Sequence, residues 1–264
     1  MPKRIAANGI ELAYEDTGDS GPAVVFVHGL GGSTRAWDAQ LFACEDRFRG
    51  IAYDQRGHGA SEKPKGPYSI EQWSADLIGL LDGLGIGEAA IVGHSVGCMV
   101  AAETAAELGE RVWALALCGG TPSWSAEGQQ ALTERAELAR AGKMAEIAET
   151  VTTSGLSERC RQDRADIQRR MRELIEANDA KAYAEAATAT AAGSMDGLER
   201  IESPVLSFSG SEDPVTPPRE AAAIAARCQR GEAEVIPGAA HWCMLENPEA
   251  FNRLVFGFLE RKAP

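Results

Sequence analysis

The pentapeptide GHSVG (residues 93–97) places a serine between two glycines, after a β-branched run and before an alanine-rich run. Residues 89–92 have the composition of a short buried strand, and residues 96–108 that of a helix that ends at Gly109. A turn this tight strains its central residue, and only small flanking side chains let strand and helix approach. The pattern G-x-S-x-G therefore predicts a nucleophile elbow that presents the Ser95 hydroxyl at the carboxyl edge of a sheet.

A serine hydroxyl becomes a good nucleophile only when a base removes its proton, and that base is usually histidine. The chain has four histidines. His28, His58 and His94 lie in glycine-rich turns, where we expect the backbone setting to matter more than the ring. His241 lies instead in a loop between the last predicted strand and the last predicted helix, so it is predicted to be the base.

The acid that orients this histidine is predicted to be Asp213, which follows a predicted strand and precedes a proline that holds its backbone extended. Ser95, Asp213 and His241 then occur in the order expected for a nucleophile elbow. The rival acids are Glu212, next to Asp213, and Glu246, close to His241 in sequence. We expect Glu246 to cap the last helix or to lie on its surface.

The oxyanion of an acyl-transfer intermediate needs hydrogen-bond donors. The amide that follows the nucleophile, Val96, is predicted to be one of them. The glycine-rich stretch HGLGGS (28–33) is predicted to supply the other, from the backbone N–H of Leu30. Two glycine-rich loops that end neighbouring strands favour this interpretation over that of idle flexible turns.

Strands and helices alternate along the first part of the chain. The expected elements are a hairpin around Asn8-Gly9, strands at 23–29 and 49–59, a helix at 69–85, the elbow strand and helix, and a strand at 112–118. Ser69 is the expected cap of the helix at 69–85, with Gln72 at the capping-box position. This alternation predicts an α/β fold with a mostly parallel central sheet flanked by helices.

The pattern changes between about 122 and 195, where strand-like runs vanish and three or four amphipathic helices are expected. Alternation then resumes with a strand at 204–210, a helix near 218–228, a strand at 233–238 and a helix at 248–261. We therefore expect a core formed by 1–121 and 196–264, and an inserted helical cap (122–195) that covers the pocket and selects the substrate.

Composition narrows the possible partners. The 264 residues, 44% hydrophobic, suit one large domain, and a net charge of −13 argues against binding to nucleic acid or to anionic membranes. No signal-peptide pattern is visible, and the longest apolar run (112–118) is too short to span a bilayer. Six cysteines form no C-x-x-C pair, which favours reduced thiols in a cytoplasmic protein. No cofactor and no metal site is predicted.

The motifs VHGLGGS, YDQRGHGAS, GHSVG, GSEDPVTPP and PGAAHW occur in the order found in α/β-hydrolase-fold serine hydrolases, and the chain resembles that family over nearly its whole length. Within it, RAGKMAEIAETV and AHWCMLENPEAFNRLVFGFL make the chain most similar to the 3-oxoadipate enol-lactonase group of small esterases and lactonases. The resemblance implies hydrolysis of a small ester or lactone through an acyl-enzyme. Cys98, where these lactonases often carry glycine, and the stretch EAATATAAGSMDGL depart from the pattern.

Serine at the elbow argues against haloalkane dehalogenases and epoxide hydrolases, which need aspartate there. Three alternatives stay open: a C–C bond hydrolase that uses the same triad, cofactor-free oxygen chemistry, and a slow-turnover ligand receptor. The physiological substrate and the oligomeric state do not follow from the sequence.

A carboxylate-bearing enol-lactone would need a local cation in so acidic a chain. Residues 121–195 hold ten Lys and Arg against twelve Asp and Glu, and the basic residues between Arg159 and Arg172 are the candidates for a pocket arginine. Their alternative interpretation is the solvated face of an amphipathic helix, because Arg169, Arg170 and Arg172 flank the apolar Met171.

Overall fold

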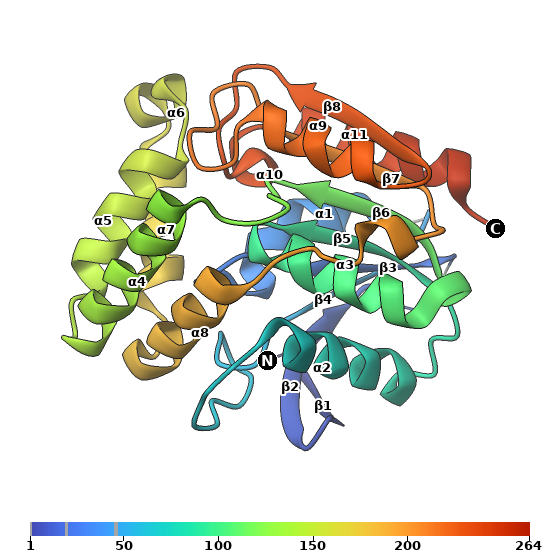
Figure 1. Ribbon diagram of the computed structural model, residues 1–264, viewed down its shortest axis with the longest axis horizontal. Coiled ribbons are helices and arrows are strands. Elements are labelled where there is room, and N and C mark those ends of the chain that lie inside the picture. The colour runs from blue at the N-terminus through green and yellow to red at the C-terminus, as the bar shows by residue number, and fades with distance from the viewer. Residues whose placement is uncertain (1, 19–20, 45–46) are drawn as a thin grey trace.

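The computed structural model describes residues 2–18, 21–44 and 47–264 of the chain. Within these residues, the chain forms an eight-stranded sheet in the order β1-β2-β4-β3-β5-β6-β7-β8 (Figure 1). The strands are β1 (Lys3–Ala7), β2 (Ile10–Asp16), β3 (Ala23–Val27), β4 (Arg49–Tyr53), β5 (Ala89–His94), β6 (Val112–Cys118), β7 (Val205–Gly210) and β8 (Gly231–Ile236). β2 pairs antiparallel with β1 and β4, and the other neighbours are parallel, as predicted.

Helices cover both faces of this sheet. The helices outside residues 122–195 are α1 (Asp38–Cys44), α2 (Ile70–Gly83), α3 (Val96–Leu108), α9 (Pro218–Arg227), α10 (Cys243–Glu246) and α11 (Pro248–Lys262), with short 3-10 helices η1 (Thr34–Trp37), η2 (Gly109–Arg111) and η3 (Leu198–Arg200). α2, α3 and α9 pack along one face, while α1 and α11 contact each other on the opposite face. The sequence pattern does not predict α1 and α10, because helices of seven and four residues are too short to show a 3.6-residue period.

Local sequence explains several of these elements. β3 and β5 are buried along their whole length, as expected for central parallel strands with helices on both faces. The hairpin turn has positive φ at Asn8 (46°) and Gly9 (78°), which this residue pair tolerates. The Ser69 side chain accepts from the Gln72 N–H at 3.2 Å, which confirms the cap. The reciprocal half of the capping box does not form, because Gln72 Oε1 has no hydrogen-bond partner among the residues that the structure describes.

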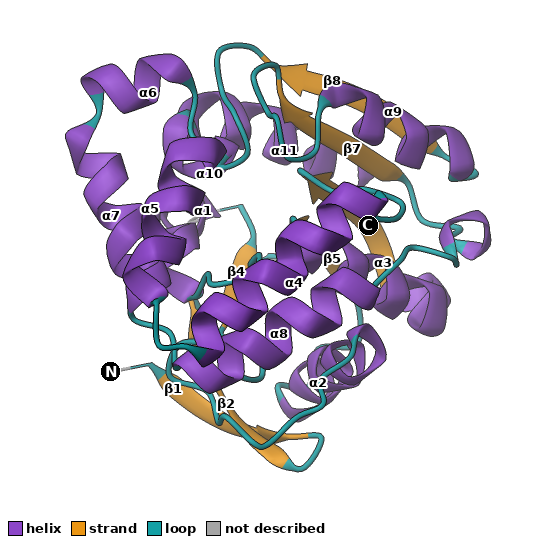
Figure 2. Cartoon of the chain, turned by 60° about the vertical axis from the view of Figure 1, so that its left-hand side comes forward, coloured by secondary structure: helices purple, strands orange, loops and turns teal. Residues whose placement is uncertain are grey.

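Residues 122–195, here called the helical insert, lie between β6 and β7. In this described segment they form α4 (Ala126–Arg140), α5 (Met144–Gly155), α6 (Glu158–Asp163), α7 (Ala165–Glu176) and α8 (Ala180–Ala192). The expectation of three or four helices is therefore wrong, because the six-residue α6, capped by Ser157, was too short to recognise. α4 packs on α8 and α5 on α7, and the group lies together on the left in Figure 1 and towards the viewer in Figure 2.

All six cysteines are buried and free. Among the residues that the structure describes, no helix has both the length and the apolar character needed to cross a bilayer.

Candidate active site

Ser95 lies in the turn that joins β5 to α3, with φ 55° and ψ −122°. A positive φ at a residue other than glycine is strained, as the motif predicted. The turn closes only because its neighbours lack side chains: a Cβ on Gly97 would lie 2.3 Å from the Val27 carbonyl oxygen, and one on Gly93 would lie 2.5 Å from that of Gly97. The Ser95 N–H donates to the Cys118 carbonyl at 2.9 Å, which fixes the turn to β6.

Asp213 and His241 come together at the same edge of the sheet, from the loops that follow β7 and β8. Asp213 Oδ2 lies 2.9 Å from His241 Nδ1, and both side chains are buried. Burial alone would raise the pKa of Asp213. The attraction to His241 and the hydrogen bonds from His241 and Thr216 outweigh burial and lower that pKa below its usual range. The carboxylate therefore stays ionised and holds a proton on His241 Nδ1.

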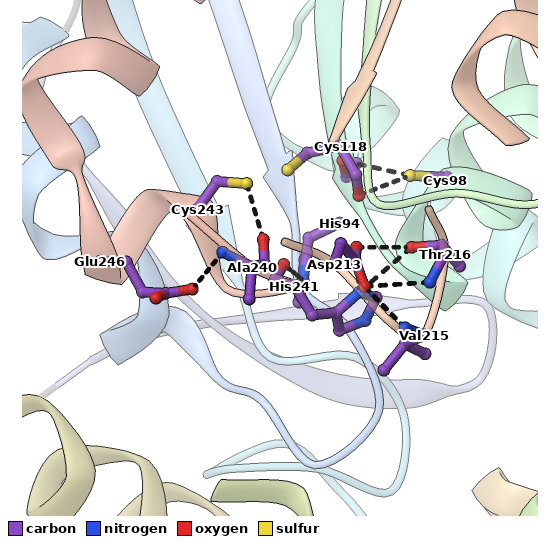
Figure 3. A network of polar contacts seen from close by, with 11 residues as sticks. His94, Cys98, Cys118, Asp213, Val215, Thr216, Ala240, His241, Cys243 and Glu246 are labelled. Atoms are coloured by element: carbon purple, nitrogen blue, oxygen red, sulfur yellow. Dashed lines mark hydrogen bonds and ion pairs between the residues drawn. The ribbon is translucent and has the colours of Figure 1, made fainter. Parts of the chain in front are cut away.

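Thr216 belongs to this network and was not recognised from sequence. Asp213 Oδ1 accepts from the backbone N–H of Val215 (2.8 Å) and of Thr216 (3.0 Å). The Thr216 hydroxyl donates to Asp213 Oδ2 at 2.8 Å and lies 3.2 Å from His241 Nδ1 (Figure 3). An aspartate that binds the N–H groups two and three residues on is a known turn pattern, so the stretch DPVT carried a usable signal.

Neither rival acid reaches the ring of His241. Glu212 is exposed and accepts a hydrogen bond from the Glu158 N–H at 3.2 Å. Glu246 neither caps α11 nor lies idle on its surface, so that expectation is wrong. Its Oε1 accepts from the Ala240 N–H and its Oε2 from the Ser157 N–H, both at 2.8 Å (the first in Figure 3). Asn247 caps α11 instead.

Glu246 and its neighbours join the His241 loop to the helical insert. Ala240 directly precedes His241, while Ser157 is the N-cap of α6, so the one carboxylate holds both segments. The His241 N–H also donates to the carbonyl of Gly155, the last residue of α5, at 3.1 Å. Two independent hydrogen-bonded links therefore tie the position of His241 to that of the insert.

The rings of His28 and His94 form hydrogen bonds at the site, which the sequence did not predict. Burial lowers the pKa of both, that of His28 to about 4, so both are neutral. His94 Nε2 lies 3.0 Å from the carbonyl oxygen of His241 and must donate to it, and the two rings lie 4.9 Å apart. His28 Nε2 accepts from the Gln55 N–H at 3.0 Å, which holds the start of the glycine-rich loop.

The two predicted oxyanion donors lie beside Ser95. A Cβ on Gly29 would lie 3.0 Å from the Ser95 Cβ, so the loop that carries Leu30 runs directly against the elbow. The Leu30 N–H donates to none of the described residues. Val96 opens α3, and the first N–H groups of a helix have no acceptor within the helix. Among the described residues, neither amide has a backbone acceptor.

Ser95 and His241 line a small cavity of about 50 Å³. Its walls come from the sheet edge and from the insert: Leu30, His94, Ser95, Trp124, Leu132, Arg135, Val151, Ser154, Gly155, Thr190, Val215, His241 and Trp242. Cys98 lies behind the elbow, where its thiol donates to backbone carbonyls of β5 and β6. Within the described ranges, no cluster of His, Cys, Asp or Glu side chains is arranged to hold a metal ion.

The expected pocket arginine lies elsewhere in the sequence. None of the basic residues between Arg159 and Arg172 lines the cavity, as far as the structure describes the chain. Arg164, Arg170 and Arg172 instead form ion pairs with Asp166, Asp38 and Glu149. The arginine that does line the cavity comes from α4, a helix for which sequence analysis gave no inward-facing residue.

Comparison with known proteins identifies the family of the chain as the alpha/beta hydrolase fold. A sequence model described as the alpha/beta hydrolase fold matches residues 22–248. The chain is 32% identical to "3-oxoadipate enol-lactonase 2" of Acinetobacter baylyi over 97% of this chain and 96% of that protein. Its structure superposes on a thermophilic esterase from Thermogutta terrifontis, solved with malate bound, with a TM-score of 0.93, 29% identity and coverage of 99% and 100%. It also matches the enol-lactonase from Burkholderia xenovorans LB400, with a TM-score of 0.92, 30% identity and coverage of 98% and 100%.

Proposed function

Because the chain belongs to the alpha/beta hydrolase fold family, we propose that it hydrolyses a small carboxylic ester or lactone through an acyl-enzyme. Enol-lactonases and an esterase among its relatives, each aligned over nearly the full chain, support this class of substrate. The observation that carries the proposal is the hydrogen-bonded pair of Asp213 and His241 at the cavity that Ser95 also lines.

In the proposed mechanism Ser95 attacks the carbonyl carbon, and His241 Nε2 accepts the hydroxyl proton. Asp213 keeps the other ring proton on Nδ1 and stabilises the imidazolium that forms. The N–H groups of Leu30 and Val96 stabilise the oxyanion, and His241 returns the proton to the leaving oxygen. Water, activated by the same histidine, then cleaves the acyl-enzyme.

The helical insert acts in this proposal as a cap on the core formed by 1–121 and 196–264. Support comes from the cavity, since α4, α5 and α8 all contribute side chains to its wall. A wall built from the insert limits the size of the acyl group that reaches Ser95.

Turnover of p-nitrophenyl acetate, p-nitrophenyl butyrate and a series of small lactones tests this function, with Ser95→Ala as control. We expect multiple turnovers that Ser95→Ala abolishes. A near-stoichiometric burst without turnover would identify a ligand receptor instead. Turnover of diketone substrates without turnover of esters would identify a C–C bond hydrolase.

A further inference from the structure

The loop that follows β3 carries the predicted oxyanion donor Leu30, and the loop that follows β4 holds it. β3 and β4 are parallel neighbours, so both loops leave the same edge of the sheet. Asp54 and Gln55 are the first two residues after β4, and both are buried. Neither lines the cavity at Ser95 or a larger cavity of about 680 Å³ that shares six lining residues with it. Asp54 and Gln55 are therefore not placed to contact a substrate in these cavities.

Asp54 and Gln55 bind this loop at its two ends. Asp54 Oδ1 accepts from the Thr34 N–H at 2.7 Å, and its Oδ2 accepts from the Ala60 N–H at 2.7 Å. The Gln55 side-chain Nε2 donates to the His28 carbonyl at 2.6 Å, while the Gln55 backbone N–H donates to His28 Nε2 at 3.0 Å. The loop is thus bound on both sides of its oxyanion donor.

The backbone N–H of Gln55 also fixes the tautomer of His28. Because Nε2 of this neutral ring accepts a hydrogen bond, the ring proton lies on Nδ1. Nδ1 then donates to the Gly29 carbonyl at 2.8 Å, and the Gly32 N–H donates to the same oxygen at 2.9 Å. In a trans peptide the carbonyl and the following N–H point in opposite directions. The two hydrogen bonds to Gly29 therefore fix the direction of the Leu30 N–H.

The side chain of Gln55 is buried at a cost in free energy. It is 1% exposed, and its Oε1 has no hydrogen-bond partner among the residues that the structure describes. A buried polar atom without a partner is unfavourable, and an apolar side chain of the same length would avoid that cost. The amide of Gln55 adds what an apolar side chain cannot, which is the hydrogen bond to the His28 carbonyl.

We propose that Asp54 and Gln55 are positioning residues that hold the loop 28–34 so that the Leu30 N–H points at the oxyanion formed when Ser95 attacks. This inference rests on the proposed function and adds to it two residues that touch neither the substrate nor the reacting atoms. The oxyanion exists only after the attack, so a displaced donor raises the barrier without weakening substrate binding. The expected signature is a lower kcat at an unchanged KM.

Two variants test the two ends of the loop. Gln55→Met keeps the length of the side chain and removes its donor, while Asp54→Asn keeps the shape and replaces one acceptor by a donor. In each variant we expect kcat for p-nitrophenyl butyrate to fall about 10- to 100-fold, less than the loss of about 10²- to 10³-fold that follows removal of an oxyanion donor. KM should change by less than about twofold.

Ser74→Ala is the matched control for these variants. The Ser74 hydroxyl lies 2.9 Å from that of Thr104, and this buried hydrogen bond joins α2 to α3 without contacting the oxyanion loop. Its loss should lower the free energy of unfolding, as the loss of any buried hydrogen bond does, and should leave both kcat and KM unchanged.

Inhibition by butylboronic acid separates positioning from a loss of folded protein. The boron atom bonds to Ser95 Oγ, the hydroxyl proton passes to His241, and a boron-bound oxygen takes the place of the oxyanion. Because this adduct resembles the transition state, we expect its inhibition constant to rise in each variant by about the factor by which kcat falls. A smaller folded fraction would lower kcat and leave the inhibition constant unchanged.

An unchanged kcat in both variants would overturn the inference, and so would a lower kcat with an unchanged inhibition constant. Both outcomes leave the proposed function intact. If Asp54→Asn does not fold, Gln55→Met decides by itself. If the wild-type protein hydrolyses no ester, the proposed function fails separately, and calorimetric titration of butylboronic acid then decides. Binding that Gln55→Met weakens about tenfold or more supports the inference, and binding that is absent or unaffected refutes it.

Discussion

The sheet edge and the helical insert contribute to the same cavity in different ways. Here the sheet edge means the loops after β3, β5, β7 and β8, which carry Leu30, Ser95, Asp213 and His241. Its geometry is set by backbone constraints, such as the strained φ of Ser95 and close approaches that exclude any Cβ. The insert contributes through side chains on helix faces, and its one inward cation, Arg135, is held by a single tyrosine. Under the proposed function, the edge would carry the reaction and the insert would select the substrate.

The largest effect should come from the edge. We expect Ser95→Ala to lower kcat by roughly 10⁴- to 10⁶-fold, the range for loss of a triad nucleophile, with an unchanged unfolding midpoint. Steady-state hydrolysis of p-nitrophenyl butyrate measures it. Activity at the wild-type rate would show that the edge does not carry the reaction.

Asp213→Asn should come next, because the amide favours the wrong histidine tautomer at a cost of about 10⁴ in kcat by analogy with serine proteases. Glu212→Gln, adjacent but exposed, is the matched control and should change kcat less than about twofold, as surface substitutions usually do. If the two variants behaved in the opposite way, Glu212 would be the acid.

Acid should destabilise the core, which carries all four histidines, before the insert. Burial lowers the pKa of His28 to about 4 and of His58 to about 3. In the unfolded chain both histidines have a pKa of about 6.5 and take up protons below that pH, whereas in the folded chain they do not. The free energy of unfolding therefore falls as the pH drops from about 6.5 towards 4. Between pH 7.5 and pH 5.5 we expect the free energy of unfolding to fall by about 3 kcal/mol because of these two histidines. Urea unfolding at the two pH values measures this difference.

The helical insert is the internal control for the acid experiment. The insert contains no histidine, and because the pKa of Asp213 is lowered, that carboxylate affects stability only below the ordinary aspartate pKa of about 3.8. Hydrogen exchange at pH 5.5 should therefore lose protection first in residues 28–33. Earlier loss in α4–α8 would contradict this order.

The smallest effect should come from the link between the two regions. Each carboxylate oxygen of Glu246 accepts from one backbone N–H, and Glu246→Gln removes one of these two acceptors. We expect kcat to fall about tenfold, the effect of losing one charge-assisted hydrogen bond. KM should change little, since Glu246 does not line either cavity. Glu249→Gln, exposed on α11, is the control. A change in KM alone would place Glu246 in substrate binding rather than in the positioning of His241.

The backbone of the elbow could be predicted closely because its determinants are local. GHSVG requires small residues at fixed positions, and the strands around it are continuous apolar runs, so β6 and α3 match their predicted limits. The order of motifs then brought Asp213 and His241 together without any knowledge of distances.

The insert could be predicted only as helices. Amphipathic spacing finds the buried face of α5 or α7, but it does not say whether that face meets a cavity or another helix. Arg135 therefore escaped notice, while the conspicuous Arg169–Arg172 cluster lies outside the cavity lining. Glu246 was misread for a similar reason, since its partner Ser157 is 89 residues away.

The double attachment of the His241 loop has a consequence for protein engineering. The insert begins and ends at neighbouring points, where Ser123 and Ser194 form a β-bridge. It could therefore be exchanged between related proteins as one segment. A transplanted insert that lacked a helix start able to offer an N–H to Glu246, or a helix end able to offer a carbonyl to His241, would bring its own pocket but leave the base unsupported. Chimeras should therefore carry the segment 155–157 and the segment 240–246 from the same parent.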